Sequence, residues 1–271
     1  MKSSNLTRYL VESAMMIALA TVLSIFKIVE MPYGGSVTMA SMLPMVILAY
    51  RHGVKRGIGA GVVYAALQQL LGLNTLSYVT TWQSILAVIL LDYIVAFTVV
   101  GFGGLFRKSV KTQRGALAIG ALLVSLLRYA CHVISGATVW AGLSIPDSAA
   151  LIYSFGYNAT YMLPEAIILI AVAYYLGGVI DFSKATPTRA VMERHYNGDP
   201  SLALLSGLSF LLGGVVDVWL IAPCLQNAET GEFYFKGLMN ADWISIGIVT
   251  ALAVIMGISL ILLSKQKKTD N

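Results

Sequence analysis

Ionisable side chains inside apolar stretches are the residues of this sequence best suited to do chemistry. Asp92 lies near the middle of the apolar run 82–106, and Arg128 and His132 lie four residues apart in the run 115–137. An ionised group at the centre of a bilayer costs about 2.5–3.5 kcal/mol even on insertion scales, so such groups usually face a partner, a cavity or a transport pathway. The three residues therefore mark a candidate site.

The same spacing of four continues beyond His132 to Gly136 and Trp140. Residues four apart share one face of an α-helix, with a drift of about 40° at each step. One helix side can therefore present a cation, an imidazole, a bare stretch of backbone and an indole to a single cleft.

A second aromatic segment, 153–161, carries three tyrosines and Asn158. An interfacial aromatic belt accounts for the tyrosines but not for the amide. Carboxylate, imidazole, amide and aromatic faces together suit a flat, nitrogen-rich, positively charged ligand, because cation–π contacts contribute about 0.5–2 kcal/mol each.

Three other interpretations stay open at this point. Asp92, Arg128 and His132 could form a buried ion-pair network that fixes helix packing and binds nothing. A membrane hydrolase is disfavoured, because the sequence has serines near His132 but no Gly-x-Ser-x-Gly or His-Glu-x-x-His motif. An ion-coupled secondary transporter of a small cationic or heteroaromatic solute would use Asp92 or Glu165 as its proton carrier.

The composition places these residues in a membrane protein. Hydrophobic residues make up 58% of the 271 positions and charged residues 11%, with a mean hydropathy of +0.78, whereas soluble domains are about 25% charged. A membrane-crossing helix takes about 20 residues. We therefore expect an all-α integral membrane protein with apolar helices at about 9–26, 37–50, 57–73, 82–106, 115–137, 150–178, 202–223 and 243–264.

The basic residues predict the orientation of these helices. Fifteen of the 18 Lys and Arg residues fall in alternate connections, on the same side as both ends of the chain. The positive-inside rule then makes both termini cytoplasmic. The net charge of +5 is explained by this topology and gives no reason to invoke nucleic acid as a partner.

Small residues and turn residues mark special segments. Ala14 and Ala18 lie four apart in the first helix, and Gly57, Gly61 and Ala65 do so in the third. Such rows let helices approach closely, within the chain or, as the less favoured alternative, against another membrane subunit.

The run 37–50 is short and follows the turn-rich residues 31–36, so we expect a segment that dips into or folds over the outer face.

Five ordered stretches within residues 8–178 carry a family resemblance. The sequence resembles the thiamine-specific substrate-binding (S) component of energy-coupling factor transporters. Each stretch alone is a weak motif, but five in the same order are specific. They are 31–37 (MPYGGSV), 50–55 (YRHGVK), 91–93 with 96–97 (LDY, AF), 127–129 with 132–136 (LRY, HVISG) and 157–164 (YNATYMLP).

The resemblance implies a binding component of an ATP-driven vitamin transporter in the bacterial cell membrane. Uptake would be powered by a membrane coupling protein and two cytoplasmic ATPase subunits. This chain would use no cofactor of its own and is not expected to be an enzyme, and it contains no Gly-x-x-x-x-Gly-Lys-Ser/Thr loop for ATP. The implied domains are a six-helix substrate-binding core at 1–180, a cytoplasmic linker at 181–200 and a two-helix membrane extension at 201–271.

The resemblance also assigns residues. It implies that Asp92 and His132 hold the aminopyrimidine of thiamine, and that Trp140, Tyr153 and Asn158 supply ring stacking and hydrogen bonds. The other residues it implies are Tyr93, Arg128 and Gly136 at the site, Gly34 and Gly35 in a lid, and Ala14 and Ala18 at the face that meets the coupling protein.

Three features depart from the family pattern. Tyr153 and Asn158 are five apart, about 140° around a regular helix, so both reach one site only if Tyr153 lies in a loop or an irregular first turn. Glu165 follows Pro164 within an apolar run, and no role follows for it from the resemblance. Residues 179–271, which include Asp217, have no counterpart in the six-helix pattern.

Overall fold

A computed structural model describes residues 2–31, 34–140, 150–190, 200–221, 224 and 235–266. The chain forms two compact units, Met1–Thr188 and Arg189–Asn271. The boundary between them falls inside the segment 181–200 that the sequence marks as a linker. Pro32 and Tyr33 of the first family stretch lie outside the described residues, as does the connection 141–149.

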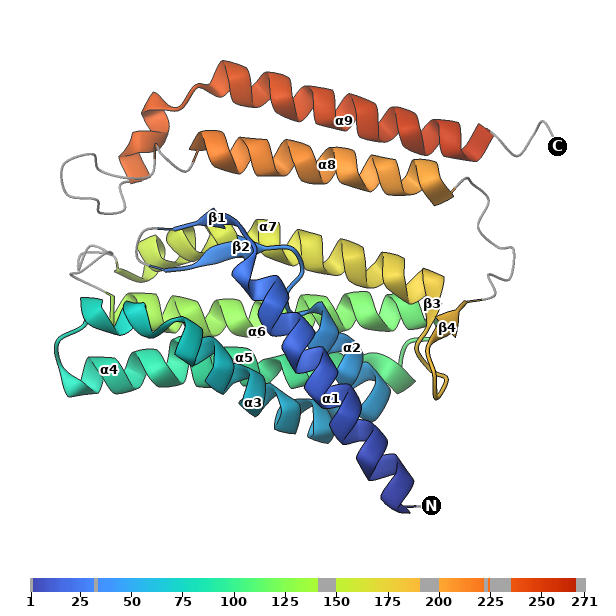
Figure 1. The fold of residues 1–271 in the computed structure, drawn as a ribbon. Helices are drawn as coiled ribbons and strands as arrows, with labels where there is room; N and C mark the ends of the chain where they lie inside the picture. Colours follow the sequence, from blue (N-terminus) through green and yellow to red (C-terminus); the bar gives the residue numbers. More distant parts are fainter. Residues whose placement is uncertain are drawn as a thin grey trace. The chain divides into compact units, whose positions relative to one another are not determined.

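The first unit is mostly helical (Figure 1). The expectation of an all-α chain is wrong at two short strand pairs, one of which, β1–β2, is antiparallel. The elements of this part of the chain are α1 Lys2–Ile25, β1 Lys27–Glu30, β2 Ser36–Thr38, α2 Leu43–His52, α3 Val54–Leu71, the 3₁₀ segment η1 Leu73–Tyr78, α4 Trp82–Val88, the π-helical segment η2 Ile89–Val95, α5 Ala96–Thr98, the 3₁₀ segment η3 Val99–Lys108, α6 Gln113–Thr138, α7 Ala150–Val179, β3 Ile180–Asp181 and β4 Thr188–Arg189.

Five helical segments of the described residues are long and apolar enough to cross a membrane. The predicted runs 9–26, 82–106, 115–137, 150–178 and 243–264 correspond to these segments. They are Leu6–Ile25, Trp82–Lys108, Gln113–Thr138, Ala150–Val179 and Trp243–Leu260.

The predicted run 37–50 is not a span. Its first residues pair as β2 with β1, and the helix α2 that follows has ten residues. Ten residues of α-helix measure about 15 Å, half of a bilayer core of about 30 Å. Pro44 starts this half-helix in its first turn, and Gly53, with φ of 87°, ends it. The expected dipping segment is therefore a hairpin that leads into a buried half-helix.

The row Gly57, Gly61 and Ala65 packs inside the first unit, as its favoured interpretation predicted. All three residues are buried. A Cβ atom on Gly57 would lie 2.7 Å from Cβ of Ala49. By contrast, the side chains of Ala14 and Ala18 on α1 are exposed on the surface of the unit.

The basic connections of the first unit meet at one end of it. The guanidinium of Arg51 donates to both carboxylate oxygens of Glu12 at 2.8 Å and to the carbonyl of Phe182 at 2.7 Å. His52 lies 2.7 Å from the same carboxylate, and Arg107 donates to the carbonyl of Arg51 at 3.2 Å. This common end agrees with basic residues in alternate connections, while the side of the membrane it faces stays a prediction.

The second unit contains a pair of long helices joined by polar contacts. Its described elements are α8 Pro200–Ile221, the 3₁₀ segment η5 Phe235–Asn240 and α9 Trp243–Gln266. The hydroxyl of Ser206 donates to the carbonyl of Gly257 at 2.8 Å, and that of Ser209 to the carbonyl of Ala253 at 3.0 Å. Thr250 donates to Asp217 at 2.7 Å. Serine hydroxyls and small residues thus allow α8 and α9 to pack closely without a hydrophobic driving force.

The packing of α3 generates a first prediction, because Gly57 and Gly59 lie on opposite sides of the same helix. In Gly57→Ala the new methyl meets Ala49 and the backbone of Gly101 within 2.8 Å, and overpacking of this kind costs about 1–3 kcal/mol. In Gly59→Ala the nearest atom is the hydroxyl of Tyr9 at 3.6 Å, so only helix propensity changes. We expect a lower thermal midpoint in detergent for Gly57→Ala alone, and equal midpoints would contradict the packing.

Candidate functional site

The first unit encloses a cavity of about 620 Å³ beneath the β1–β2 hairpin. This volume lies within the range of about 300–1,000 Å³ that is usual for small-molecule sites. The walls come from the end of α1, the hairpin, α3, η1, the helical segment 82–108, α6 and α7. The residues that line it include Thr38, Asp92, Tyr93, Phe97, Arg128, His132, Gly136, Trp140, Tyr157, Asn158, Tyr161 and Glu165.

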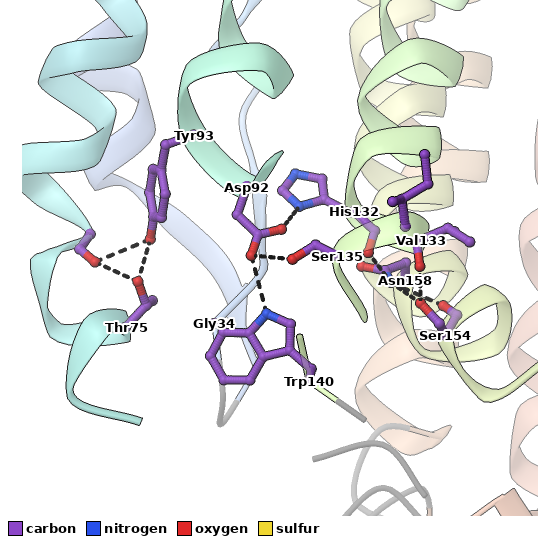
Figure 2. A network of polar contacts seen from close by, with 12 residues as sticks. Gly34, Thr75, Asp92, Tyr93, His132, Val133, Ser135, Trp140, Ser154 and Asn158 are labelled. Atoms are coloured by element: carbon purple, nitrogen blue, oxygen red, sulfur yellow. Dashed lines mark hydrogen bonds and ion pairs between the residues drawn. The ribbon is translucent and has the colours of Figure 1, made fainter. Parts of the chain in front are cut away.

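Asp92 is the centre of a hydrogen-bond network (Figure 2). Oδ1 lies 3.0 Å from Nδ1 of His132, while Oδ2 accepts from the hydroxyl of Ser135 at 2.7 Å and from the indole N–H of Trp140 at 3.1 Å. All three partners of Asp92 belong to α6 or to the residues just after it. An ionised carboxylate has about four acceptor positions, so this arrangement leaves one for a ligand.

The backbone around Asp92 is a π-helix, which places the carboxylate toward α6. Segments of π-helix are rare and are frequent at functional sites. The side chain of Tyr93, the next residue, contacts the end of α3 and η1 instead. Its hydroxyl donates to the carbonyl of Gly72 at 3.1 Å and lies 3.0 Å from the hydroxyl of Thr75. Tyr93 also stacks on Phe97, with ring centroids 6.3 Å apart.

The bond to Asp92 fixes the role of His132. When Nδ1 carries the proton and donates to the ionised carboxylate, Nε2 is a hydrogen-bond acceptor. Nε2 is buried and has no hydrogen-bond partner among the described residues. His132 can therefore accept a hydrogen bond from an amine of a bound molecule.

A separate ion pair lies at the floor of the cavity. Arg128 is 6% exposed and Glu165 4%, and Nη1 of the arginine lies 3.1 Å from Oε2 of the glutamate. The guanidinium also lies 4.5 Å from the ring centroid of Phe97. The interpretation of Asp92, Arg128 and His132 as one ionic network is therefore wrong, because Arg128 pairs with Glu165 and His132 pairs with Asp92.

The structure brings most of the predicted site residues together but not Tyr153. The side chains of Asp92, Tyr93, Arg128, His132, Trp140 and Asn158, with the backbone at Gly136, line the cavity. Tyr153 lies in a regular turn of α7 and packs against the cluster of Val79, Val88 and Trp140 behind the cavity wall. Neither of the irregular conformations expected for it occurs, and its ring reaches the site through Trp140, so a direct contact of Tyr153 with a ligand stays a prediction.

Tyr157, Tyr161 and Glu165 form the row that sequence reasoning missed. They lie four apart on α7, and all three line the cavity. The hydroxyl of Tyr161 donates to Oδ1 of Asn158 at 2.6 Å, and Nδ2 of Asn158 donates to the carbonyl of His132 at 3.2 Å. The spacing of four was a signal that could have identified this face.

The hairpin lies against the same face of α7. Gly34 and Gly35 have φ of 99° and 89°, a region that glycine adopts without strain. A Cβ atom on Gly35 would lie 2.8 Å from the ring of Tyr161. The hydroxyl of Tyr157 donates to the carbonyl of Gly34 at 3.3 Å. The glycines thus permit the turn to sit directly on aromatic rings of the cavity wall.

A family model described as thiamine transporter protein matches residues 10–181, which contain every residue of the cavity. The chain belongs to this family. It is 38% identical over 178 residues to the thiamine transporter ThiT of Bacillus subtilis, a match that covers 62% of this chain and 88% of that protein. With ThiT of Lacticaseibacillus paracasei the identity is 27% over 154 residues, which cover 53% of this chain and 71% of that protein.

The fold of this thiamine transporter family member also resembles a solved structure. ThiT from Listeria monocytogenes superposes with a TM-score of 0.52 at 22% identity, covering 62% of this chain and 92% of that one. The family resemblance read from the sequence is thus confirmed, and the chain is a multi-pass membrane protein of a transporter family and not an enzyme. The family match ends at residue 181, so α8 and α9 lie beyond it.

Two buried serines of α6 provide a matched prediction for the Asp92 network. The hydroxyl of Ser135 donates to Asp92, whereas the buried hydroxyl of Ser125 has no partner among the described residues. A hydrogen bond to a charged group contributes about 1.5–3 kcal/mol. We expect Ser135→Ala to lower the thermal midpoint of the ligand-free protein by about 3–10 °C and Ser125→Ala to leave it unchanged or raise it. Equal midpoints would show that Ser135 does not stabilise the carboxylate.

Proposed function

We propose that this chain captures thiamine from outside the cell in the cavity beneath the β1–β2 hairpin, as the substrate-binding component of an energy-coupling factor transporter. The observation that carries the proposal is the network of Asp92, His132 and Trp140, which combines an ionised acceptor, a free imidazole acceptor and an aromatic face in one small-molecule cavity. Thiamine offers the complementary groups: a thiazolium cation, an aminopyrimidine amine and two flat rings.

The charges of the cavity support a cationic ligand. With His132 neutral, the carboxylates among the described lining residues outnumber the Lys and Arg side chains by one. Arg128 is paired with Glu165, and Lys27 with Glu30. Binding a monocation therefore neutralises the cavity, and Asp92 carries the charge that is not balanced by a fixed cation.

The required affinity needs several contacts acting together. Nanomolar binding corresponds to about 12 kcal/mol, whereas one cation–π contact gives about 0.5–2 kcal/mol. Trp140, Phe97, Tyr157 and Tyr161 present aromatic surface to the cavity, and Asp92 and His132 add directed hydrogen bonds. We assign ring stacking to Trp140, Tyr157 and Tyr161, with Tyr153 packed against Trp140.

The energy for uptake comes, in this proposal, from other subunits. No phosphate-binding Gly-x-x-x-x-Gly-Lys-Ser/Thr loop occurs in the sequence. A membrane coupling protein and two cytoplasmic ATPases would supply it, and the exposed Ala14 and Ala18 on α1 provide a flat face for close helix contact with the coupling protein. Release of thiamine would then take place on the cytoplasmic side.

Equilibrium binding tests the proposal directly. Titration of the purified chain with thiamine should quench Trp fluorescence saturably at nanomolar to low-micromolar ligand. Asp92→Ala and His132→Ala should weaken binding by at least tenfold, because each removes a hydrogen bond to the ligand, and Trp140→Phe should reduce the quenching amplitude. Trp82 is 70% exposed and does not line the cavity, so Trp82→Phe is the matched control for Trp140→Phe and should bind thiamine as the parent does. Binding no tighter than millimolar would refute the proposal.

The energy source separates this function from ion-coupled transport. Reconstituted with its coupling protein and ATPases, the chain should take up thiamine only with ATP, and collapse of the proton gradient should leave uptake unchanged. An ion-coupled carrier would instead transport thiamine alone, would stop when the gradient collapses, and would lose uptake when its proton carrier is removed, in Asp92→Asn or in Glu165→Gln. That result would remove the ATP-driven assignment.

A further inference from the structure

Gly34, Gly35, Ser36 and Thr38 of the β1–β2 hairpin form part of the cavity wall, so the position of the hairpin determines how far the cavity is closed. Two of its contacts with α7 lie at the turn: Gly34 accepts a neutral hydrogen bond from Tyr157, and Gly35 packs on Tyr161. The third lies at the end of β2, where the hydroxyl of Thr38 is 2.7 Å from Oε1 of Glu165. A hydrogen bond to an ionised carboxylate is roughly twice as strong as a neutral one.

Glu165 is built to hold this contact. Its Oε2 is bonded to Arg128 at 3.1 Å and its Oε1 to Thr38, so each oxygen has a donor from a different element. Glu165, Thr38 and Arg128 are each at most 6% exposed. Because a buried charge loses stabilisation when it loses a donor, the glutamate favours the conformation in which β2 lies against α7.

The backbone just after Thr38 is strained, and the hydrogen bond between Thr38 and Glu165 helps to hold it in that conformation. Ala40 has φ of 55°, a left-handed conformation that is unfavourable for a residue with a Cβ atom. The hydroxyl of Ser41 lies 2.7 Å from that of Thr38, and the sulfur of Met42 lies 3.0 Å from Nη1 of Arg128. Strained turns persist where their surroundings fix them, and here Thr38, Ser41 and Met42 are the fixed points.

We propose that Glu165 is a positioning residue that holds the hairpin closed over the occupied cavity through Thr38, and that this bond sets the rate at which the ligand leaves. The inference rests on the proposed function for the identity of the ligand, thiamine. The carboxylate of Glu165 is paired with Arg128, so it does not balance the charge of thiamine, and it does not belong to the Asp92 network. Holding the hairpin gives this buried group a role of its own.

Three threonine variants test the proposal without disturbing the ion pair. Thr38→Val removes the hydroxyl and keeps the shape, Thr38→Ser keeps the hydroxyl, and Thr21→Val makes the same change where the hydroxyl donates only within α1, to the carbonyl of Ile17. In stopped-flow measurements we expect thiamine to dissociate about tenfold faster from Thr38→Val, with association unchanged or faster. Thr38→Ser and Thr21→Val should release thiamine at the parent rate.

Glu165→Gln shows whether the glutamate acts through Thr38. The amide is a weaker acceptor, so dissociation should be faster than in the parent, but the effect should largely disappear in the Thr38→Val background because the two residues form one contact. Fully additive effects, or a parent dissociation rate in Thr38→Val, would overturn the proposal even if the parent protein binds thiamine tightly.

Hydrogen exchange of the ligand-free protein provides a test that does not depend on thiamine. Backbone amides of residues 35–41 should exchange faster in Thr38→Val than in the parent or in Thr38→Ser. Failure of the parent to bind thiamine would sink the proposed function alone, whereas unchanged exchange in Thr38→Val would sink the role of Glu165 in holding the hairpin.

Discussion

An ionised carboxylate inside a membrane protein must be surrounded by donors, and the donors of Asp92 determine much of the first unit. They come from His132, Ser135 and Trp140, so the last turns of α6 must lie beside the part of segment 82–108 that contains Asp92. The π-helical turn at Ile89–Val95 directs the carboxylate toward them, and a residue without a side chain, Gly136, lies between them on the cavity wall.

Two separate pairs of ionisable side chains line the cavity along α6. His132 and Arg128 are one helical turn apart, about 6 Å, yet each has a carboxylate of its own. Around Asp92 no Lys or Arg of the described residues pairs with the carboxylate, which leaves its charge for a cation, whereas at the floor Arg128 and Glu165 neutralise each other. The floor pair is therefore free to engage the chain itself, at Thr38.

Sequence patterns predicted the long helices and the α6 row well, because apolar length and a spacing of four are local properties. The hairpin and half-helix were only partly predicted, since turn residues at 31–36 and Pro44 signal a bend without specifying strand pairing. Tyr153 packs behind Trp140, because a regular helix turns it about 140° from Asn158, and its contact with a ligand stays a prediction. The partner of Arg128 was missed for another reason: Glu165 is 37 residues away, and no local spacing connects the two.

The half-helix α2 joins two regions that face opposite ends of the unit. Met42, just before its first residue, contacts Arg128 at the cavity floor. At the other end, Arg51 and His52 in the last turn of α2 bind the carboxylate of Glu12 on α1. Its residues 43–49 are buried, so it cannot bend without disturbing the core. A ten-residue rod fixed at both ends transmits displacement along its axis, so a displacement of α1 at Glu12 would also shift the cavity floor at Arg128.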